Sequence, residues 1–159
     1  MRKKKLIAAV IKRLRVDIEL YHRAAVAARA EATHEQSRAE NKYDTRGLEA
    51  SYLARGQSRQ VAEIEQAIEK FEKMEAREFV AGEEIETGAV VELASGREKN
   101  VYFIGPRAGG TEVTFEKKEV LVITAESPLG AQLIGKKEGE KHRIEIAGAK
   151  QEFTVAAVW

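Results

Sequence analysis

Hydrophobic residues recur at steps of three and four over the first half of the chain, which is the spacing of one face of an α-helix. Two such runs occur, Leu6, Ile7, Val10, Ile11, Leu14, Ile18 and Tyr21 in the first and Val61, Ile64, Ile68, Phe71 and Met74 in the second. A polar stretch containing residues 41–47 separates them, and no proline lies between Lys3 and Phe79. The pattern predicts two helices joined near residues 41–47 into an antiparallel hairpin. An arm of about 35 residues would be roughly 50 Å long.

The middle of this hairpin is lined by alanine instead of large hydrophobic residues, at Ala24, Ala25, Ala27, Ala28, Ala30 and Ala32. Small side chains let two helices approach closely but bury little apolar area. We therefore expect a thin arm with a weakly held far end, which suits insertion into a narrow opening.

After Gly82 hydrophobic and polar positions tend to alternate, which is the period of a half-buried β-strand. Strands are predicted near residues 90–93, 101–103, 113–115, 120–123, 143–146 and 153–158. Five or six short strands with one short helix indicate a small α+β domain, near the lower size limit for an independent core. The predicted domains are an antiparallel coiled-coil hairpin at residues 1–79 and a small antiparallel β domain at residues 80–159.

The composition narrows the protein class. Hydrophobic residues make up 43% and charged residues 33% of the 159, and there is no cysteine. Disulfides and thiolate metal sites are therefore excluded, and a reducing cytosol is the expected compartment. Residues 1–15 are basic and then apolar, but Lys12, Arg13 and Arg15 interrupt the apolar positions. Neither a signal peptide nor a membrane span fits, so a cytoplasmic protein without a membrane partner is expected.

The net charge is +1, but the charges are unevenly placed. The start of the first predicted helix carries only basic charges, at Arg2, Lys3, Lys4, Lys5, Lys12, Arg13 and Arg15. The end of the second is mainly acidic, at Glu63, Glu65, Glu69, Glu72, Glu75 and Glu78. An antiparallel hairpin sets these ends side by side, so pairing between the helices accounts for the basic segment. Nucleic-acid binding is the alternative interpretation.

The segment from Ser127 to Glu140 has unusually specific turn chemistry. Ser127 is a natural N-cap, and Pro128 is preset for the first helical position. Gly135 suits the left-handed residue that ends a helix after about two turns, and Gly139 begins a turn into the next strand. The segment predicts a short capped helix between two strands.

At these residues the chain resembles the C-terminal domain of the bacterial Gre transcript cleavage factors, GreA and GreB. The shared motif residues are Ser127, Pro128, Leu129, Gly130, Leu133, Gly135, Lys136 and Gly139. The aspartate that follows in the family is replaced by Glu140. The resemblance implies a coiled-coil hairpin followed by an FKBP-like C-terminal domain, in which the motif helix is part of the scaffold.

The resemblance also implies a function. A Gre factor is a transcription elongation factor that binds RNA polymerase, docks its C-terminal domain at the rim of the secondary channel and inserts the hairpin. Acidic residues at the hairpin tip then help to cleave backtracked RNA near its 3′ end. Such a protein would be a monomeric accessory factor and not an enzyme by itself. It would have no cofactor of its own, and Mg²⁺ would be held jointly with the polymerase active site.

The hairpin tip departs from the family pattern. The family motif there ends in a tyrosine, and aligning Tyr52 with it places Thr45 and Leu48 where the acidic pair is expected. The acids present instead are Asp44 and Glu49, with Glu40 on the other side of the turn. We take these three as the candidate catalytic residues, accessory to the polymerase Mg²⁺.

Other interpretations of the tip remain open. Asp44 and Glu49 share a site only if the turn, for instance at Gly47, folds them together, and Arg46 could neutralise them. Acids that alternate with basic residues are also typical of a solvated helix surface. Asp44 could equally cap a helix that starts at the next residue, with Glu49 in its first turns.

Two alternative functions follow. The altered tip favours a non-cleaving regulator that occupies the secondary channel and inhibits or tunes RNA polymerase. From another class, a peptide-binding or prolyl isomerase-like module with a dimerising arm would also fit the fold, although a fold does not give a function.

The three histidines are too scattered for a metal set, and Gly109-Gly110 is expected to form a hairpin turn.

Overall fold

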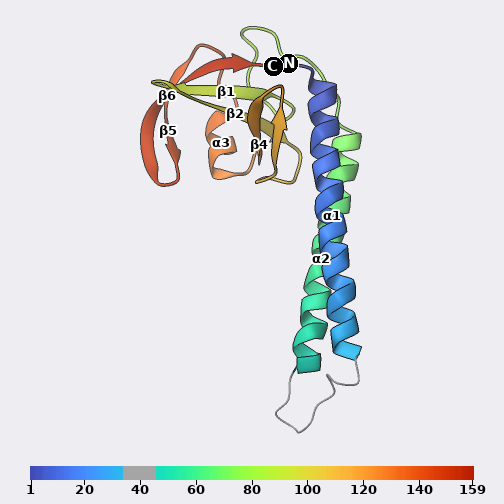
Figure 1. Ribbon diagram of the computed structural model, residues 1–159. Helices are drawn as coiled ribbons and strands as arrows, with labels where there is room; N and C mark the ends of the chain where they lie inside the picture. Colours follow the sequence, from blue (N-terminus) through green and yellow to red (C-terminus); the bar gives the residue numbers. More distant parts are fainter. Residues whose placement is uncertain (34–45) are drawn as a thin grey trace. The chain divides into compact units, whose positions relative to one another are not determined.

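The computed structural model describes residues 1–33 and 46–159, without the side chains of Ala32 and Arg46, and confirms the α+β class (Figure 1). Two helices come first, α1 at Lys3–Thr33 and α2 at Arg46–Glu72. The chain forms two compact units. One contains Met1–Arg13 together with Glu69–Trp159, and the other is Leu14–Ile68. The domain boundary expected between residues 79 and 80 stays a prediction.

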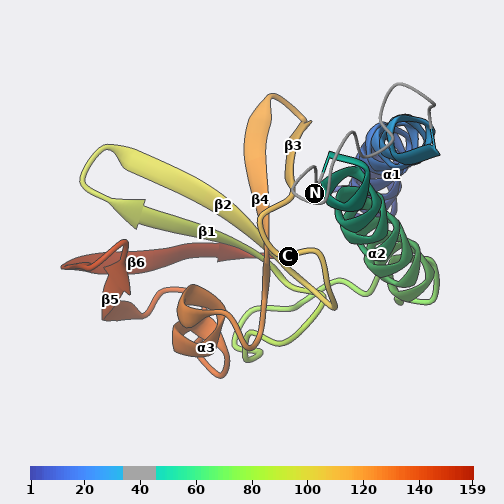
Figure 2. The ribbon, with the colours of Figure 1, turned by 90° about the horizontal axis from the view of Figure 1, so that it is seen from below.

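The unit at Leu14–Ile68 is a pair of antiparallel helical arms that lie side by side in both ribbon views (Figures 1 and 2). Its buried residues include Ala25, Ala28 and Ala54, as the alanine-rich middle of the sequence predicts. Large hydrophobic residues on the outer faces are exposed, among them Leu20 and Tyr52, each 59% exposed. Apart from Leu14 at its start, the buried hydrophobic residues of this unit are alanines, and such small side chains bury little apolar area.

The other unit contains a mixed β-sheet. Its strands are β1 (Val90–Ser95), β2 (Glu98–Gly105), β3 (Glu112–Phe115), β4 (Lys118–Thr124), β5 (Lys141–Ile146) and β6 (Ala149–Val158), with helix α3 (Pro128–Leu133) between β4 and β5. Among the described residues the strand order is β3-β4-β2-β1-β6-β5. The pairs are antiparallel, as predicted, except for β2 and β4, which run parallel with Val101 opposite Val120. The sequence did not predict this parallel pair.

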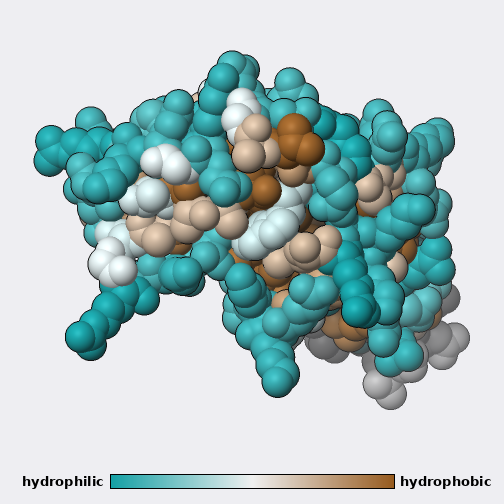
Figure 3. All heavy atoms as spheres, turned by 90° about the horizontal axis from the view of Figure 1, so that it is seen from above, coloured by the Kyte–Doolittle hydropathy of each residue, from teal (hydrophilic) through white to brown (hydrophobic). Residues whose placement is uncertain are grey.

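Helix α3 contributes to the core on one face of the sheet. Leu133 is fully buried and belongs to the same cluster as Leu93, Ile104, Ile144 and Phe153. Alternation along the strands places Val90, Phe103 and Val122 on the opposite face. In the view of Figure 3, hydrophilic side chains cover most of the surface, and hydrophobic atoms are visible in scattered patches between them.

Phe71, near the end of α2, packs on that opposite face. Its ring centroid lies 5.9 Å from that of Phe103, and Phe71 is fully buried. A Cβ atom at Gly105 would lie 2.9 Å from Phe71 Cζ and 2.8 Å from Val122 Cγ1, which is too close for any larger residue without rearrangement. The first turns of α1 and the end of α2 therefore share a compact unit with the sheet.

Candidate functional site

Helix α3 begins with the cap that the sequence predicts. Ser127 has φ −65° and ψ 154°, and its Oγ accepts a hydrogen bond of 3.0 Å from the Gly130 N–H. The same hydroxyl donates to the Thr124 carbonyl oxygen at 2.7 Å, so it links the end of β4 to α3. Pro128 occupies the start of the helix, where its missing N–H costs nothing.

Gly130 is required by close packing, which the sequence alone did not indicate. A Cβ atom at this position would lie 1.8 Å from the Thr124 carbonyl oxygen, well inside van der Waals contact. Glycine lets the first turn of α3 approach the end of β4, and Leu133 then reaches the core. Two motif residues thus have structural roles in placing α3.

The glycines that follow α3 hold it to the rest of the unit. Gly135 has φ +81°, as the predicted helix end requires, and its N–H donates to the Ile85 carbonyl oxygen at 2.9 Å. The Ile85 N–H in turn donates to the Lys136 carbonyl oxygen at 2.8 Å. Gly139, at φ +88°, donates to the Val155 carbonyl oxygen at 2.8 Å. These bonds tie the motif to residue 85 and to β6.

Glu140, which replaces the aspartate of the resembling family, closes the turn before β5. One of its carboxylate oxygens, Oε2, accepts from the Lys137 N–H at 3.1 Å and lies 2.8 Å from His142 Nε2. The hydrogen bond with His142, followed by that from Lys137, lowers the pKa of Glu140. The longer side chain therefore serves as a local turn cap.

Gln132 protects the edge of the sheet, a role that the sequence analysis missed. Its Nε2 donates to the Glu145 carbonyl oxygen at 2.9 Å, and its Oε1 accepts from the Glu145 N–H at 2.9 Å. Strand β5 is at the end of the strand order, so Glu145 would otherwise present its main chain at the edge of the sheet. No sequence signal distinguishes Gln132 from any other polar helical residue.

Glu92 links two hairpins of the sheet and was also missed. It lies in β1 with its side chain 9% exposed, and its two oxygens accept from Lys99 Nζ at 3.0 Å and Lys118 Nζ at 2.7 Å. Lys99 belongs to the β1–β2 hairpin and Lys118 to the β3–β4 hairpin, which spread apart in Figure 2. The hydrogen bonds from Lys118 and then Lys99 lower the pKa of Glu92.

The contacts of Lys3 differ from the expected pairing between the basic start of α1 and the acidic end of α2. Its side chain is buried, with the residue 1% exposed, and Nζ donates to the main-chain oxygens of Arg77 at 2.5 Å and Trp159 at 2.7 Å. It also lies 4.5 Å from the Phe79 ring centroid. Burial lowers the pKa of Lys3 to about 8. Lys3 therefore binds main-chain oxygens instead of an acid of α2, and Glu69 pairs with Lys73, four residues further along the chain.

The tip candidates are only partly described. Asp44 and Glu40 lie outside the described residues, as does the helix start expected after Asp44. Glu49 is exposed in the first turn of α2. Nearby, Leu48 is 54% exposed and Tyr52 is 59% exposed. Whether the three acids share a site stays a prediction.

In residues 1–33 and 46–159, no three histidine, aspartate or glutamate side chains are grouped so that they could hold a metal ion. Over the same residues, no helix is both long enough and apolar enough to span a bilayer.

Comparison with known proteins gives one family. Residues 80–159, half of the chain, match the family described as transcription elongation factor, GreA/GreB, C-terminal. Among solved structures, GreA factor homolog 1 (Gfh1) of Thermus thermophilus is 25% identical, with 95% of each chain covered and a TM-score of 0.40. Gfh1 of Thermus aquaticus is also 25% identical, with 95% of this chain and 94% of that chain covered and a TM-score of 0.40. No curated protein sequence matches the chain.

Proposed function

Because the chain belongs to the GreA/GreB family of transcription elongation factors, we propose that it binds RNA polymerase and inserts the hairpin of α1 and α2 into the secondary channel. There it stimulates cleavage of backtracked RNA. The family match of residues 80–159 is the observation that carries this proposal. The helices support it, since the 31 residues of α1 correspond to a rod of roughly 46 Å. The protein would act in the cytoplasm as an accessory factor of the polymerase active site.

In this proposal the tip acids Asp44 and Glu49, with Glu40, approach the polymerase active site. Carboxylate oxygens are the ligands that Mg²⁺ prefers, and the metal ion would supply charge neutralisation for the attacked phosphodiester. Glu49 supports the assignment, because its exposed position in the first turn of α2 leaves the carboxylate near the hairpin end. The role of this chain would be to bring oxygen ligands to the metal and to orient a water.

A non-cleaving channel regulator is the second candidate. The observation that favours it is Leu48, a hydrophobic residue 54% exposed at a position where the family tip is expected to carry an acid. An exposed leucine cannot bind Mg²⁺, whereas a channel occupant needs only shape and contact. Under this alternative the protein competes for the channel without shortening RNA.

A cleavage assay on a backtracked RNA polymerase elongation complex tests the proposal. With Mg²⁺ and the full-length protein, the 3′ end of labelled RNA should shorten faster than by the intrinsic activity of the polymerase. The Asp44→Asn, Glu49→Gln variant should lose most of this stimulation while still binding polymerase. Glu63→Gln, which neutralises another exposed acid of α2, is the matched control and should cleave normally.

The other outcomes separate the candidates. Binding to polymerase with no shortening, together with displacement of an authentic Gre factor, would establish the regulator. If the protein does not bind polymerase in any state, both candidates are wrong.

A further inference from the structure

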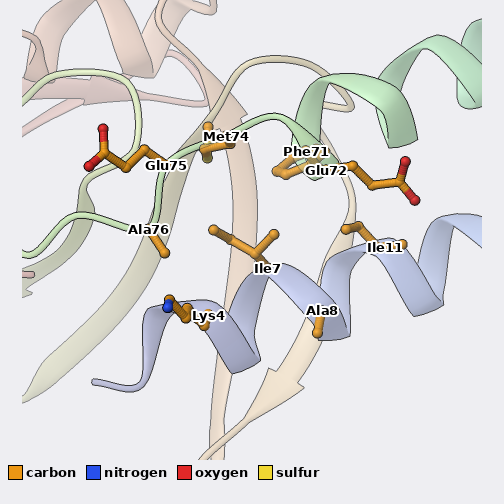
Figure 4. A pocket seen from close by; sticks show the side chains of 9 residues that line it. All are labelled: Lys4, Ile7, Ala8, Ile11, Phe71, Glu72, Met74, Glu75 and Ala76. Carbon is orange, nitrogen blue, oxygen red and sulfur yellow. The ribbon is translucent and has the colours of Figure 1, made fainter.

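A groove of about 500 Å³ lies beside the first turns of α1, within the compact unit that also holds the sheet (Figure 4). One wall is α1, which contributes Lys4, Ile7 and Ile11. The other wall is the end of α2 and the residues after it, including Phe71 and Met74. The volume is within the range that protein clefts use to bind ligands and partner side chains.

The floor of the groove is apolar and partly open to solvent. Ile7 and Phe71 are buried, whereas Ile11 and Met74 are half-buried. In Figure 4, Ile7 and Ile11 project from α1 toward the side of Phe71 and Met74. A methionine side chain is unbranched and adapts to irregular surfaces, so Met74 can adjust to an inserted apolar group.

The α1 wall has the geometry that a second helix recognises. Its lining residues are Lys4, Ile7, Ala8 and Ile11. Residues four apart are neighbours on a helix, so these side chains form two short adjacent rows on one face, Lys4 with Ala8 and Ile7 with Ile11. Ala8 is exposed and small, which lets another helix approach the backbone closely. Side chains of a helix pack between such ridges, and an amphipathic helix inserts its apolar face into a groove of this kind.

The two walls carry opposite charges. Lys4 lines the α1 side, and Glu72 and Glu75 line the other side. All three side chains are exposed. Within the described part of the chain, neither Lys4 nor Glu75 is in an ion pair. A partner would therefore be favoured if it carried acid on one flank and base on the other.

We propose that this groove binds an amphipathic helix of a partner protein. The apolar ridge of that helix enters between Ile11 and Met74, an acidic flank faces Lys4, and an Arg or Lys flank faces Glu72 and Glu75. The proposal goes beyond transcript cleavage, since it concerns the base of the hairpin and requires no tip residue.

Synthetic helical peptides test the proposal on the full-length protein. Four capped 18-residue peptides share one leucine ridge and differ in their two flanks, which are Glu/Arg, Glu/Glu, Arg/Arg or Gln/Gln. Fluorescence anisotropy at low salt should rank the Glu/Arg peptide tightest, by about tenfold over the Glu/Glu and Arg/Arg peptides. A helical peptide can lie in the groove in either direction. The order of the four affinities therefore depends on which charges the two flanks carry and not on which flank carries the acid.

Charge variants of the protein should change the ranking. Lys4→Glu makes both walls acidic, so the Arg/Arg peptide should become the tightest. Glu72→Lys with Glu75→Lys makes both walls basic, so the Glu/Glu peptide should become the tightest. Glu65→Lys is the matched control, because Glu65 is exposed on α2 but does not line the groove. It should keep the original ranking.

The binding site is checked independently by methyl NMR. The chain has two methionines, so the Met74 methyl signal can be assigned with a single substitution. The Glu/Arg peptide should shift the Met74 and Ile11 methyl signals. The proposal would be overturned if a peptide binds without shifting these signals, or if no peptide binds. It would also be overturned if the order of peptide affinities stays the same in the charge variants of the two walls. Binding of the apolar dye 1-anilinonaphthalene-8-sulfonate at Met74 in the absence of peptide binding would overturn it in favour of a small apolar ligand.

Discussion

Lys3 Nζ donates a 2.7 Å hydrogen bond to the main-chain oxygen of Trp159, 156 positions later in the sequence. Trp159 also pairs with Val90, its N–H donating at 2.9 Å and its oxygen accepting at 3.0 Å. A second bond from Lys3, to the Arg77 oxygen, adds the segment that follows α2. The buried ammonium group of Lys3 therefore links the first turn of α1 to the residue after β6 and to the segment between α2 and β1.

The first prediction concerns Lys3 and alkaline pH. Burial lowers the pKa of Lys3 from its ordinary 10.5 to about 8 in the folded chain. Between these values the unfolded chain binds more protons, so the contribution of Lys3 makes the free energy of unfolding rise with pH. The limiting effect is about 3 kcal/mol. Urea unfolding at pH 7.5 to 10 should show this rise in the wild type but not in Lys3→Met.

The comparison controls for other groups. Burial also raises the pKa of Tyr102, which lowers the stability as pH rises through its titration, but Tyr102 is present in both proteins. Lys4→Met, which removes the exposed neighbouring lysine, should behave as the wild type. If Lys3→Met and the wild type have parallel pH profiles, Lys3 stays protonated when folded and the prediction fails.

The second prediction concerns Gly130. Gly130→Ala places a Cβ atom 1.8 Å from the Thr124 oxygen, so α3 must move away from the end of β4. We expect a loss of about 3 kcal/mol or more in the free energy of unfolding, in the range of core overpacking and backbone strain. Gly56→Ala is the matched control, since its added Cβ meets no atom within 4 Å beyond its chain neighbours and the adjacent backbone of its own helix, and the position is inside α2. It should stabilise the chain by about 0.5–1 kcal/mol. Equal melting temperatures for the two variants would contradict the packing account.

The third prediction concerns Glu92 and acid. Its pKa is lowered by hydrogen bonds from Lys118 and Lys99, so the stabilisation is present above the ordinary value of 4.5 and is lost as pH falls through the lowered folded value. Glu92→Gln should cost about 1–2 kcal/mol at pH 7, allowing for the solvent exposure of both lysines. The difference from the wild type should shrink below pH 4.5. Glu98→Gln, at an exposed position of β2, should cost little at either pH.

The sequence predicts best what depends on near neighbours. The Ser127 cap, the positive φ of Gly135 and the alanine-lined arms follow from residues a few positions apart, and all three are found. Lys3, by contrast, has partners 74 and 156 positions away, and a run of basic residues does not reveal which one is buried. The parallel pairing of β2 with β4 also escaped prediction, because hydrophobic periodicity identifies strands but not their order.

The same contrast between local sequence signals and long-range contacts holds for the candidate site. Gly130 was identified as a motif residue, but its reason is a contact with Thr124 that only the folded chain defines. Gln132 and Glu92 were missed because their neighbours in the sequence do not distinguish them from other polar residues. The partners of Gln132 at the strand edge and the two lysines that contact Glu92 are defined only by the fold. Asp44 and Glu40 remain candidates by resemblance, and Glu49 is the one tip acid with a described position.

The fourth prediction concerns the edge of the sheet at β5. Gln132→Ala removes the two 2.9 Å bonds to the main chain of Glu145 while leaving a good helix former in α3. The Glu145 amide proton should then exchange with solvent at least tenfold faster, and because the edge is no longer covered, the protein should aggregate more readily on warming. Hydrogen exchange followed by NMR measures the first effect, and light scattering the second.

Gln151→Ala is the matched control, since Gln151 is exposed in β6 and its main-chain pairing with Ile144 does not need its side chain. Unchanged exchange at Glu145 in the Gln132 variant would mean that the backbone of β5 is protected by something other than the Gln132 amide.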